Sequence, residues 1–219
     1  MYRQLIPVIK MKPQINLSPD MNAKLVCVIL AFCSISFNLI AQEAVLKKVF
    51  NGRNLNGWVV PENNIWWSVA DGILKTKSGP NKKGSILWTE KEYTDFVLET
   101  DFKYDEGTVD TGIFIRTDTQ QIQMGISGSL KRDMTASPYI AGKGYPVEAQ
   151  NVKDILKPKD WNTIKVIAIA GYYEVWLNNK HVMSYTSDNY VKTGPIGLQL
   201  HPNTDMAASF RNIRIGKLK

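Results

Sequence analysis

The chain has 219 residues, of which 44% are hydrophobic and 21% charged, a composition typical of a folded protein with one main domain. Its net charge of +7 is spread along the chain, with no basic run longer than the pairs Lys82–Lys83 and Lys131–Arg132. Because binding to nucleic acid requires clustered positive charge, the sequence predicts no nucleic-acid partner.

Residues 1–42 are expected to be an N-terminal extension and a signal peptide. Lys24 supplies a short positive region, residues 25–40 an apolar core, and Ala41 a small residue before a cleavage site next to Gln42. Polar residues interrupt the apolar run, which is shorter than the roughly 20 residues that span a bilayer, so a signal peptide is favoured over a membrane anchor. The sequence therefore predicts export to the periplasm or cell surface, with no integral membrane segment in the mature chain.

Both cysteines, Cys27 and Cys33, lie in this apolar segment. Cys33 weakly resembles the acylation site of a lipoprotein, but the bulky Phe32 stands where a small residue is expected, so a lipoprotein is the less favoured alternative. Without residues 1–42 the chain keeps 23 basic and 19 acidic residues, a net charge of +4. The mature protein would then have no disulfide, cysteine nucleophile or cysteine metal site. Translation could begin at Met1 or at Met21.

Residues 43–219 are predicted to form one all-β domain. Short alternating runs follow one another after Val45, and Asp71-Gly72 and Asn178-Asn179 are turn signals between such runs. The expected strands include residues 95–102, three strands between 161 and 185, and two between 196 and 218. Many short strands without a strand–helix–strand pattern favour a β-sandwich or jelly roll over a parallel α/β fold.

Residues 127–160 break this rhythm. The segment contains several Gly and Pro residues and little periodicity, with one helical turn expected around residues 152–156. Connections of this length are uncommon in compact domains and are often functional, the alternative being a disordered surface loop. Tyr139 and Tyr145 favour the ordered rim of a site rather than a disordered loop.

Polar residues of three predicted strands lie opposite their apolar sides. The strands are residues 111–116, 121–124 and 197–201, and the polar residues are Arg116, Gln123, Gln199 and His201. If these strands are neighbours, their side chains form one polar patch with a single titratable base.

His201 is the favoured catalytic residue. Its imidazole could abstract a proton near neutral pH, or bind a metal together with carboxylates. The alternative is a solvent-facing residue at a strand end, and His181 is expected to be such a surface residue. Asp110 and Glu148 are further candidates, although most acidic residues are simply solvated. The sequence contains no His-Glu-x-x-His, Gly-x-Ser-x-Gly or phosphate-binding glycine motif.

The chain has six tryptophans, which could stack on sugar rings or pack in a core. Most are expected in the core. Trp66 and Trp176 are the more exposed candidates, and Trp176 is a candidate saccharide-binding residue.

A series of short motifs resembles the 3-keto-disaccharide hydrolase domain family, long known as a domain of unknown function. The opening run from Val49 to Trp58 is similar to the family pattern F-N-G-K-x-L-x-G-W. The likeness continues in order through residues 67–74, 93–98, 111–116, 122–123, 161–162, 177–178, 194–201 and 210–215. It covers the chain from about Val45 to Leu218.

This resemblance implies a concanavalin-like jelly roll, an exported bacterial protein, and activity on glycosides oxidised at C3. Arg116, Gln123, Gln199 and His201 fall on motif positions that would line the site. The family's chemistry leaves open a divalent metal cofactor, and the expected partner is a saccharide or glycoside.

Two functions remain open at this point. The first is a hydrolase or lyase that cleaves 3-keto-glycosides, with His201 as the base. The second is a non-catalytic carbohydrate-binding module of the same fold. A structural envelope protein would have only the fold in its favour.

Overall fold

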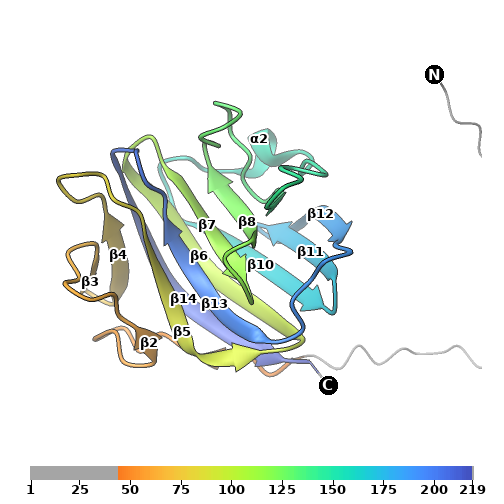
Figure 1. Cartoon of the computed structure of the whole chain (residues 1–219), viewed down its shortest axis with the longest axis horizontal. Coiled ribbons are helices and arrows are strands. Elements are labelled where there is room, and N and C mark those ends of the chain that lie inside the picture. Colours follow the sequence, from red (N-terminus) through yellow and green to blue (C-terminus); the bar gives the residue numbers. More distant parts are fainter. Residues whose placement is uncertain (1–43, 219) are drawn as a thin grey trace, which may run out of the picture. The chain divides into compact units, whose positions relative to one another are not determined.

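In the computed structural model, which describes residues 44–218, two antiparallel sheets are stacked on each other (Figure 1). The predicted signal peptide and both cysteines lie outside the described residues. Within residues 44–218 no helix is long and apolar enough to cross a membrane.

The sheet nearer the viewer in Figure 1 has six strands in the order β2-β5-β13-β7-β8-β9. Their bounds are Trp58–Val59 for β2, Ser85–Tyr93 for β5, Gly194–Leu200 for β13, Asp110–Ile115 for β7, Gln120–Gly125 for β8 and Pro138–Ile140 for β9. The central strand β13 thus lies between β5 and β7, which come much earlier in the chain.

The second sheet has eight strands, seven of them in the order β12-β11-β10-β6-β14-β4-β3, with β1 also paired to β14. Their bounds are Lys180–Thr186 for β12, Tyr172–Leu177 for β11, Asn162–Ile169 for β10, Phe96–Gly107 for β6, Met206–Lys217 for β14, Ile73–Lys77 for β4, Trp67–Ala70 for β3 and Lys47–Lys48 for β1. The one described helix, α2, covers Val152–Ile155. This architecture confirms the predicted all-β, concanavalin-like jelly roll.

The core lies between the sheets and follows the predicted alternation. In β6, Phe96, Leu98 and Phe102 are at most 1% exposed, while Glu99 and Asp101 point outward. Burying large apolar side chains from both sheets supplies the main driving force for this fold.

Both predicted two-residue turns are confirmed. Asp71 and Gly72 join β3 to β4 with φ angles of 52° and 77°, and Asn178 and Asn179 join β11 to β12 with φ angles of 47° and 65°. Positive φ at both central residues is the hairpin turn that Asn, Asp and Gly tolerate best.

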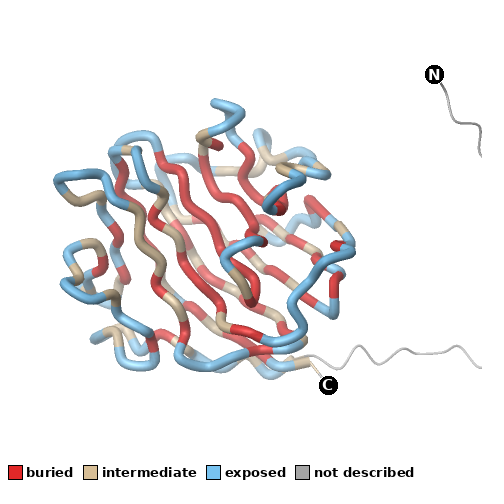
Figure 2. Tube along the Cα trace, in the orientation of Figure 1, coloured by how far each residue is buried: buried red, intermediate tan, exposed pale blue. Residues whose placement is uncertain are grey.

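β7 and β8 depart from ordinary alternation because every residue in both strands is buried (Figure 2). One of their faces packs on the core. On the outer face, the loop Ser127–Ser129 and the side chains of Tyr139 and Tyr145 cover part of these strands, while β9 and residues 134–137 pair along the edge of β8. The predicted ordered rim is therefore present, and α2 lies where one helical turn was expected.

The expectation that most tryptophans are core residues is wrong. Only Trp58 and Trp67, each 3% exposed, are fully buried. The other four are half-buried because each lies on an outer sheet face or in a loop, with part of its indole ring covered by neighbours.

Candidate functional site

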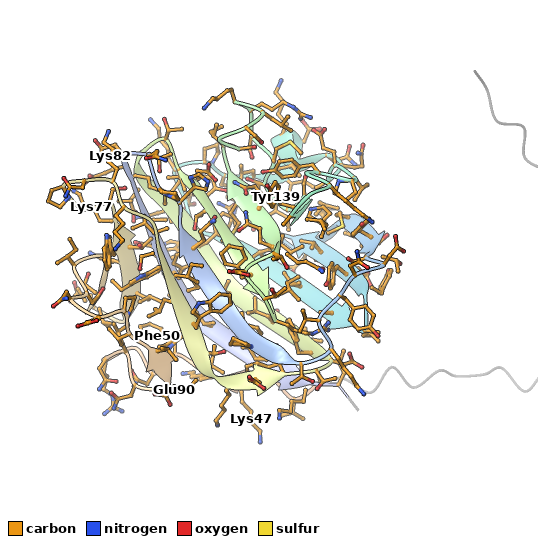
Figure 3. The ribbon with its side chains drawn as sticks, in the orientation of Figure 1. Lys47, Phe50, Lys77, Lys82, Glu90 and Tyr139 are labelled. Atoms are coloured by element: carbon orange, nitrogen blue, oxygen red, sulfur yellow. The ribbon has the colours of Figure 1, made fainter. Side chains whose placement is uncertain are left out.

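A cleft of about 370 Å³ lies on the outer face of the six-stranded sheet. Its floor is formed by β13, β7 and β8, and its walls by the loop after β8 and by β9. The lining residues are Asp110, Phe114, Asp118, Gln121, Gln123, Ser127, Gly128, Ser129, Tyr139, Tyr145, Gln199 and His201. Figure 3 shows Tyr139 beside β8, over the outer face of this sheet. The strands predicted to share a polar face are thus neighbours.

Strand register brings the floor residues together. Gly112 of β7 is paired with Gln123 of β8, and Gly197 of β13 with Phe114 of β7. Gly112 also makes room for a side chain from the next strand, because a Cβ there would lie 2.7 Å from Oε1 of Gln121. Gln121 can therefore lie flat on the sheet.

Asp110 is the buried acid of the cleft, with a side chain only 3% exposed. Its Oδ1 accepts a hydrogen bond of 2.8 Å from Nε2 of Gln123, and its Oδ2 accepts one of 2.8 Å from the backbone N–H of Gly128. The Oε1 atom of Gln123 in turn accepts from Nε2 of Gln121 at 3.0 Å. A carboxylate only accepts hydrogen bonds, so Asp110 fixes the direction of this amide relay.

His201 follows β13 directly and is 34% exposed. Its Nδ1 is 2.7 Å from the carbonyl oxygen of Pro202 and 3.6 Å from Oδ2 of Asp110. Because a carbonyl can only accept, Nδ1 must carry the proton, which leaves Nε2 free to accept one. The distance to Asp110 is too long for a hydrogen bond but short enough for its negative charge to stabilise a protonated imidazole.

Two amide oxygens of the cleft residues, Oε1 of Gln121 and Oε1 of Gln199, are buried without a hydrogen-bond partner among residues 44–218. Buried polar atoms are normally paired, so unpaired ones in a cleft point to a polar ligand. Gln121 as a whole is only 5% exposed.

Tyr145 adds a hydroxyl to the cleft wall, where its ring packs edge-on against Tyr139 with centroids 5.3 Å apart. Burial raises the pKa of Tyr145 above its usual value, more than the hydrogen bond with Ser127 lowers it. The hydroxyl is therefore protonated near neutral pH and can donate a hydrogen bond.

The residues of the cleft do not fit a divalent metal. Among residues 44–218 no group of three or more His, Cys, Asp and Glu side chains is placed to hold one. In the cleft, Nδ1 of His201 and Oδ2 of Asp110 are 3.6 Å apart, and both Asp110 oxygens already accept hydrogen bonds.

Arg116, predicted on the same face, does not reach the cleft. Its φ of 63° ends β7 and breaks the alternation, so the side chain turns into the protein and is 3% exposed. The guanidinium donates to the carbonyl oxygens of Ala170 and Val191 and lies 3.8 Å from Asp95. Burial lowers the pKa of Arg116. These contacts join the end of β7 to two loops of the other sheet.

Glu148 and Trp176 also lie outside the cleft. Glu148 forms a two-pronged ion pair with Arg132 at 2.5 and 2.7 Å, on the outside of the long segment. Trp176 lies on β11 in the other sheet, where its indole N–H donates to Glu174 and Lys165 lies over its ring. Sequence periodicity could not reveal which sheet each strand joins.

Of the predicted site residues, the cleft therefore gathers His201, Asp110, Gln123 and Gln199. Phe114 and Gln121 also line the cleft, and both lie on the same alternating face of their strands as Gly112 and Gln123. The N–H group of Gly128 belongs to no motif in the sequence, and its role appears only in the structure, where a Cβ at this position would lie 2.9 Å from Oδ2 of Asp110.

The family described as "3-keto-alpha-glucoside-1,2-lyase-like domain" matches residues 46–216. This match confirms the resemblance drawn from the short motifs. A search of curated proteins finds no match.

Solved structures with a similar fold include two from Parabacteroides distasonis ATCC 8503, each named a "putative glycosyl hydrolase". One is 18% identical with a TM-score of 0.61 and covers 80% of this chain and 94% of its own. The other is 26% identical with a TM-score of 0.60 and covers 80% and 100%. The carbohydrate-binding module CBM66 from Bacillus subtilis is 15% identical with a TM-score of 0.50, covers 75% and 98%, and shows the shared fold alone.

Proposed function

The chain belongs to the 3-keto-alpha-glucoside-1,2-lyase-like domain family, and from this premise we propose that its cleft cleaves 3-keto-glycosides with His201 as the general base. The observation that carries the proposal is the pairing of His201 with the buried carboxylate of Asp110, 3.6 Å away, in a cleft that also contains unpaired amide oxygens.

The chemistry follows from the ketone at C3. The ketone acidifies the C2 proton, so a base of moderate strength can remove it and leave an enolate. The bond between C1 and the leaving-group oxygen then breaks, a C1–C2 double bond forms, and the departing oxygen takes up a proton. Addition of water across this double bond completes a net hydrolysis.

Proton removal, enolate stabilisation and sugar binding each have a candidate residue. The Nε2 atom of His201 takes the C2 proton, and the negative charge of Asp110 stabilises the resulting imidazolium. The hydroxyl of Tyr145 donates a hydrogen bond to the enolate oxygen, where negative charge develops. Gln199 and Gln121 offer amide groups to the sugar hydroxyls.

The proposal is tested with purified protein and a 3-keto-glucoside whose aglycone absorbs light when released. A general base contributes about 10²–10⁴-fold, so His201→Ala should lower kcat by at least about 100-fold. His181→Ala is the matched control, because His181 lies on β12 of the other sheet, 3.7 Å from Glu174. Deuterium at C2 should slow the wild type, since the C2–H bond breaks in the first step.

Equally slow release of the aglycone by the wild type and by His201→Ala would refute the enzyme hypothesis. Binding of the sugar without turnover would instead support the carbohydrate-binding module. Repeating the assay with a chelator distinguishes turnover that needs a metal from turnover that does not.

We also propose that the protein is exported, on the strength of the positive, apolar and small-residue pattern before Gln42. The protein recovered from its native cells should then begin near Gln42 on N-terminal sequencing. Retention of Met21 or Met1 would contradict export through a cleaved signal peptide.

A further inference from the structure

We propose that a second pocket beside the cleft binds the leaving group of the substrate, and that Trp88 selects leaving groups that carry a six-membered ring. This inference rests on the proposed function, because it assigns the cleft to the keto-sugar and the neighbouring pocket to the group at C1.

The second pocket encloses about 710 Å³ on the same outer face, above β5 and β13. Its apolar lining comes mainly from Val59, Pro61, Trp66, Ile86 and Trp88. Glu62 and Lys83 add charged groups at the rim. An aromatic surface with polar groups around it is suited to a ring that has an apolar face and polar edges.

The pocket is continuous with the cleft. Gln199 lines both of them, and its buried Oε1 atom has no partner among the described residues. The ring of Trp88 lies 5.6 Å from the ring of Phe114, a cleft residue, at an interplanar angle of 30°. The two aromatic rings thus form one continuous, tilted aromatic surface that runs from one pocket into the other.

Gly197 leaves the space that the Trp88 ring occupies in this surface. It lies on β13 between Trp88 and Phe114, and a Cβ there would come within 2.6 Å of two carbon atoms of the Trp88 ring. The indole can therefore lie across β13 only because this residue has no side chain. Any larger residue would push the ring out of its place.

The direction of the leaving group follows from the cleft walls. On the side of β8, Tyr139, Tyr145 and the loop Ser127–Ser129 line the cleft. On the side of β5 its lining residues Phe114 and Gln199 adjoin Trp88 and the second pocket. A sugar held next to His201 therefore has room for a large C1 substituent on the Trp88 side.

The test compares 3-keto-glucosides that carry methyl, phenyl or glucosyl leaving groups. Trp88→Ala should raise KM about tenfold for the phenyl or the glucosyl substrate and change kcat/KM less than about twofold for the methyl substrate. The ratio of variant to wild type is taken for each substrate, which removes differences in intrinsic leaving-group reactivity. A loss confined to one ring identifies that ring as the preferred leaving group. A loss of the same factor for all three substrates, or no loss, would overturn the proposal.

Two further variants guard against a folding artefact. Gly197→Ala keeps the indole but displaces it, and should give the same ring-selective loss. Trp176→Ala removes a half-buried tryptophan from the other sheet and should change none of the three substrates. Retained turnover of the methyl substrate shows that each variant is folded.

Calorimetric titration of His201→Ala with the same three compounds separates this inference from the proposed function. If no substrate is turned over by the wild type, the proposed function fails. The pocket assignment then stands only if ring-bearing compounds bind about tenfold more tightly than the methyl compound and lose that advantage when Trp88→Ala is added.

Discussion

Substitution of Asp110 by asparagine should separate the charge of this residue from its hydrogen bonds. In the native protein the relay runs from Gln121 through Gln123 to Asp110, and Oε1 of Gln121 is unpaired. An asparagine can keep accepting from the Gly128 N–H through its oxygen while its own NH₂ group donates to a flipped Gln123. Gln123 would then donate to a flipped Gln121. Every bond of the relay is kept in the reverse direction.

The reversal moves Nε2 of Gln121 to the position where Oε1 had no partner, so one buried donor loses its acceptor and the expected cost to stability is about 1–3 kcal/mol. Asp110→Ala cannot reverse the relay and leaves the donors of Gln123 and Gly128 unpaired. At about 1–3 kcal/mol for each buried unpaired donor, this variant should lose about 2–6 kcal/mol. Thermal unfolding would measure the difference, at about 2–4 °C per kcal/mol for a domain of this size.

Activity should respond to the lost charge. Two unit charges 4 Å apart interact by about 4 kcal/mol at an effective dielectric of 20 and about 1 kcal/mol in bulk water. Since His201 is 34% exposed, a value of about 1–2 kcal/mol is appropriate, or a fall in kcat/KM of about 5–30-fold.

Asp205→Asn is the matched control, because its carboxylate lies outside the cleft in an exposed 3.5 Å pair with Lys82. Unchanged kcat/KM in Asp110→Asn would refute the electrostatic role of Asp110. A melting temperature as low as that of Asp110→Ala would refute the reversible relay.

Three other outcomes follow from the same structure. Tyr145→Phe should lower kcat by about 10²-fold without lowering the melting temperature of the protein by more than a few degrees, if its hydroxyl stabilises the enolate. Burial raises the pKa of Tyr173 to about 12, from about 10 in the unfolded chain, so its contribution to stability is full below pH 10 and is lost as the pH rises toward 12. Between pH 10 and pH 12, denaturant unfolding should show that the free energy of unfolding of Tyr173→Phe falls by about 2–3 kcal/mol less than that of the wild type. An equal fall in both proteins would contradict this prediction. Arg116→Met should lower the melting temperature by several degrees, because the carbonyl groups of Ala170 and Val191 lose their hydrogen-bond donor. Its kcat/KM should stay within about twofold of the wild type. A large loss of activity would show that Arg116 contributes to the active site.

Period-two alternation predicted much of the fold and part of the site. Because successive side chains point to opposite faces, Gln123 and Gln199 could be assigned to the outer side of their strands without knowing which strands are neighbours. The two hairpin turns were equally predictable, since their residues tolerate positive φ. The order β5-β13-β7 was not, because the strands that meet there are separated by long stretches of chain.

Alternation fails where the backbone leaves the extended conformation. Arg116 follows the last residue of β7, and its positive φ reverses the direction its side chain would otherwise take. A single such residue is enough to move a guanidinium from the outer face into the interior. Nothing in the sequence Ile-Arg-Thr marks that change, because arginine rarely adopts positive φ and no glycine replaces it.

The shape of the outer face also depends on two glycines, which have no side chain. Gly112 leaves room for the amide of Gln121, and Gly197 leaves room for the indole of Trp88. In a sequence a glycine within a strand indicates a bulge or a close approach of another group, but not which group approaches. Here both glycines admit a side chain from the adjacent strand, and both admitted side chains line a pocket. The surface offered to a ligand is therefore set by pairs of neighbouring strands, which is why single-strand patterns could predict its polar residues but not its shape.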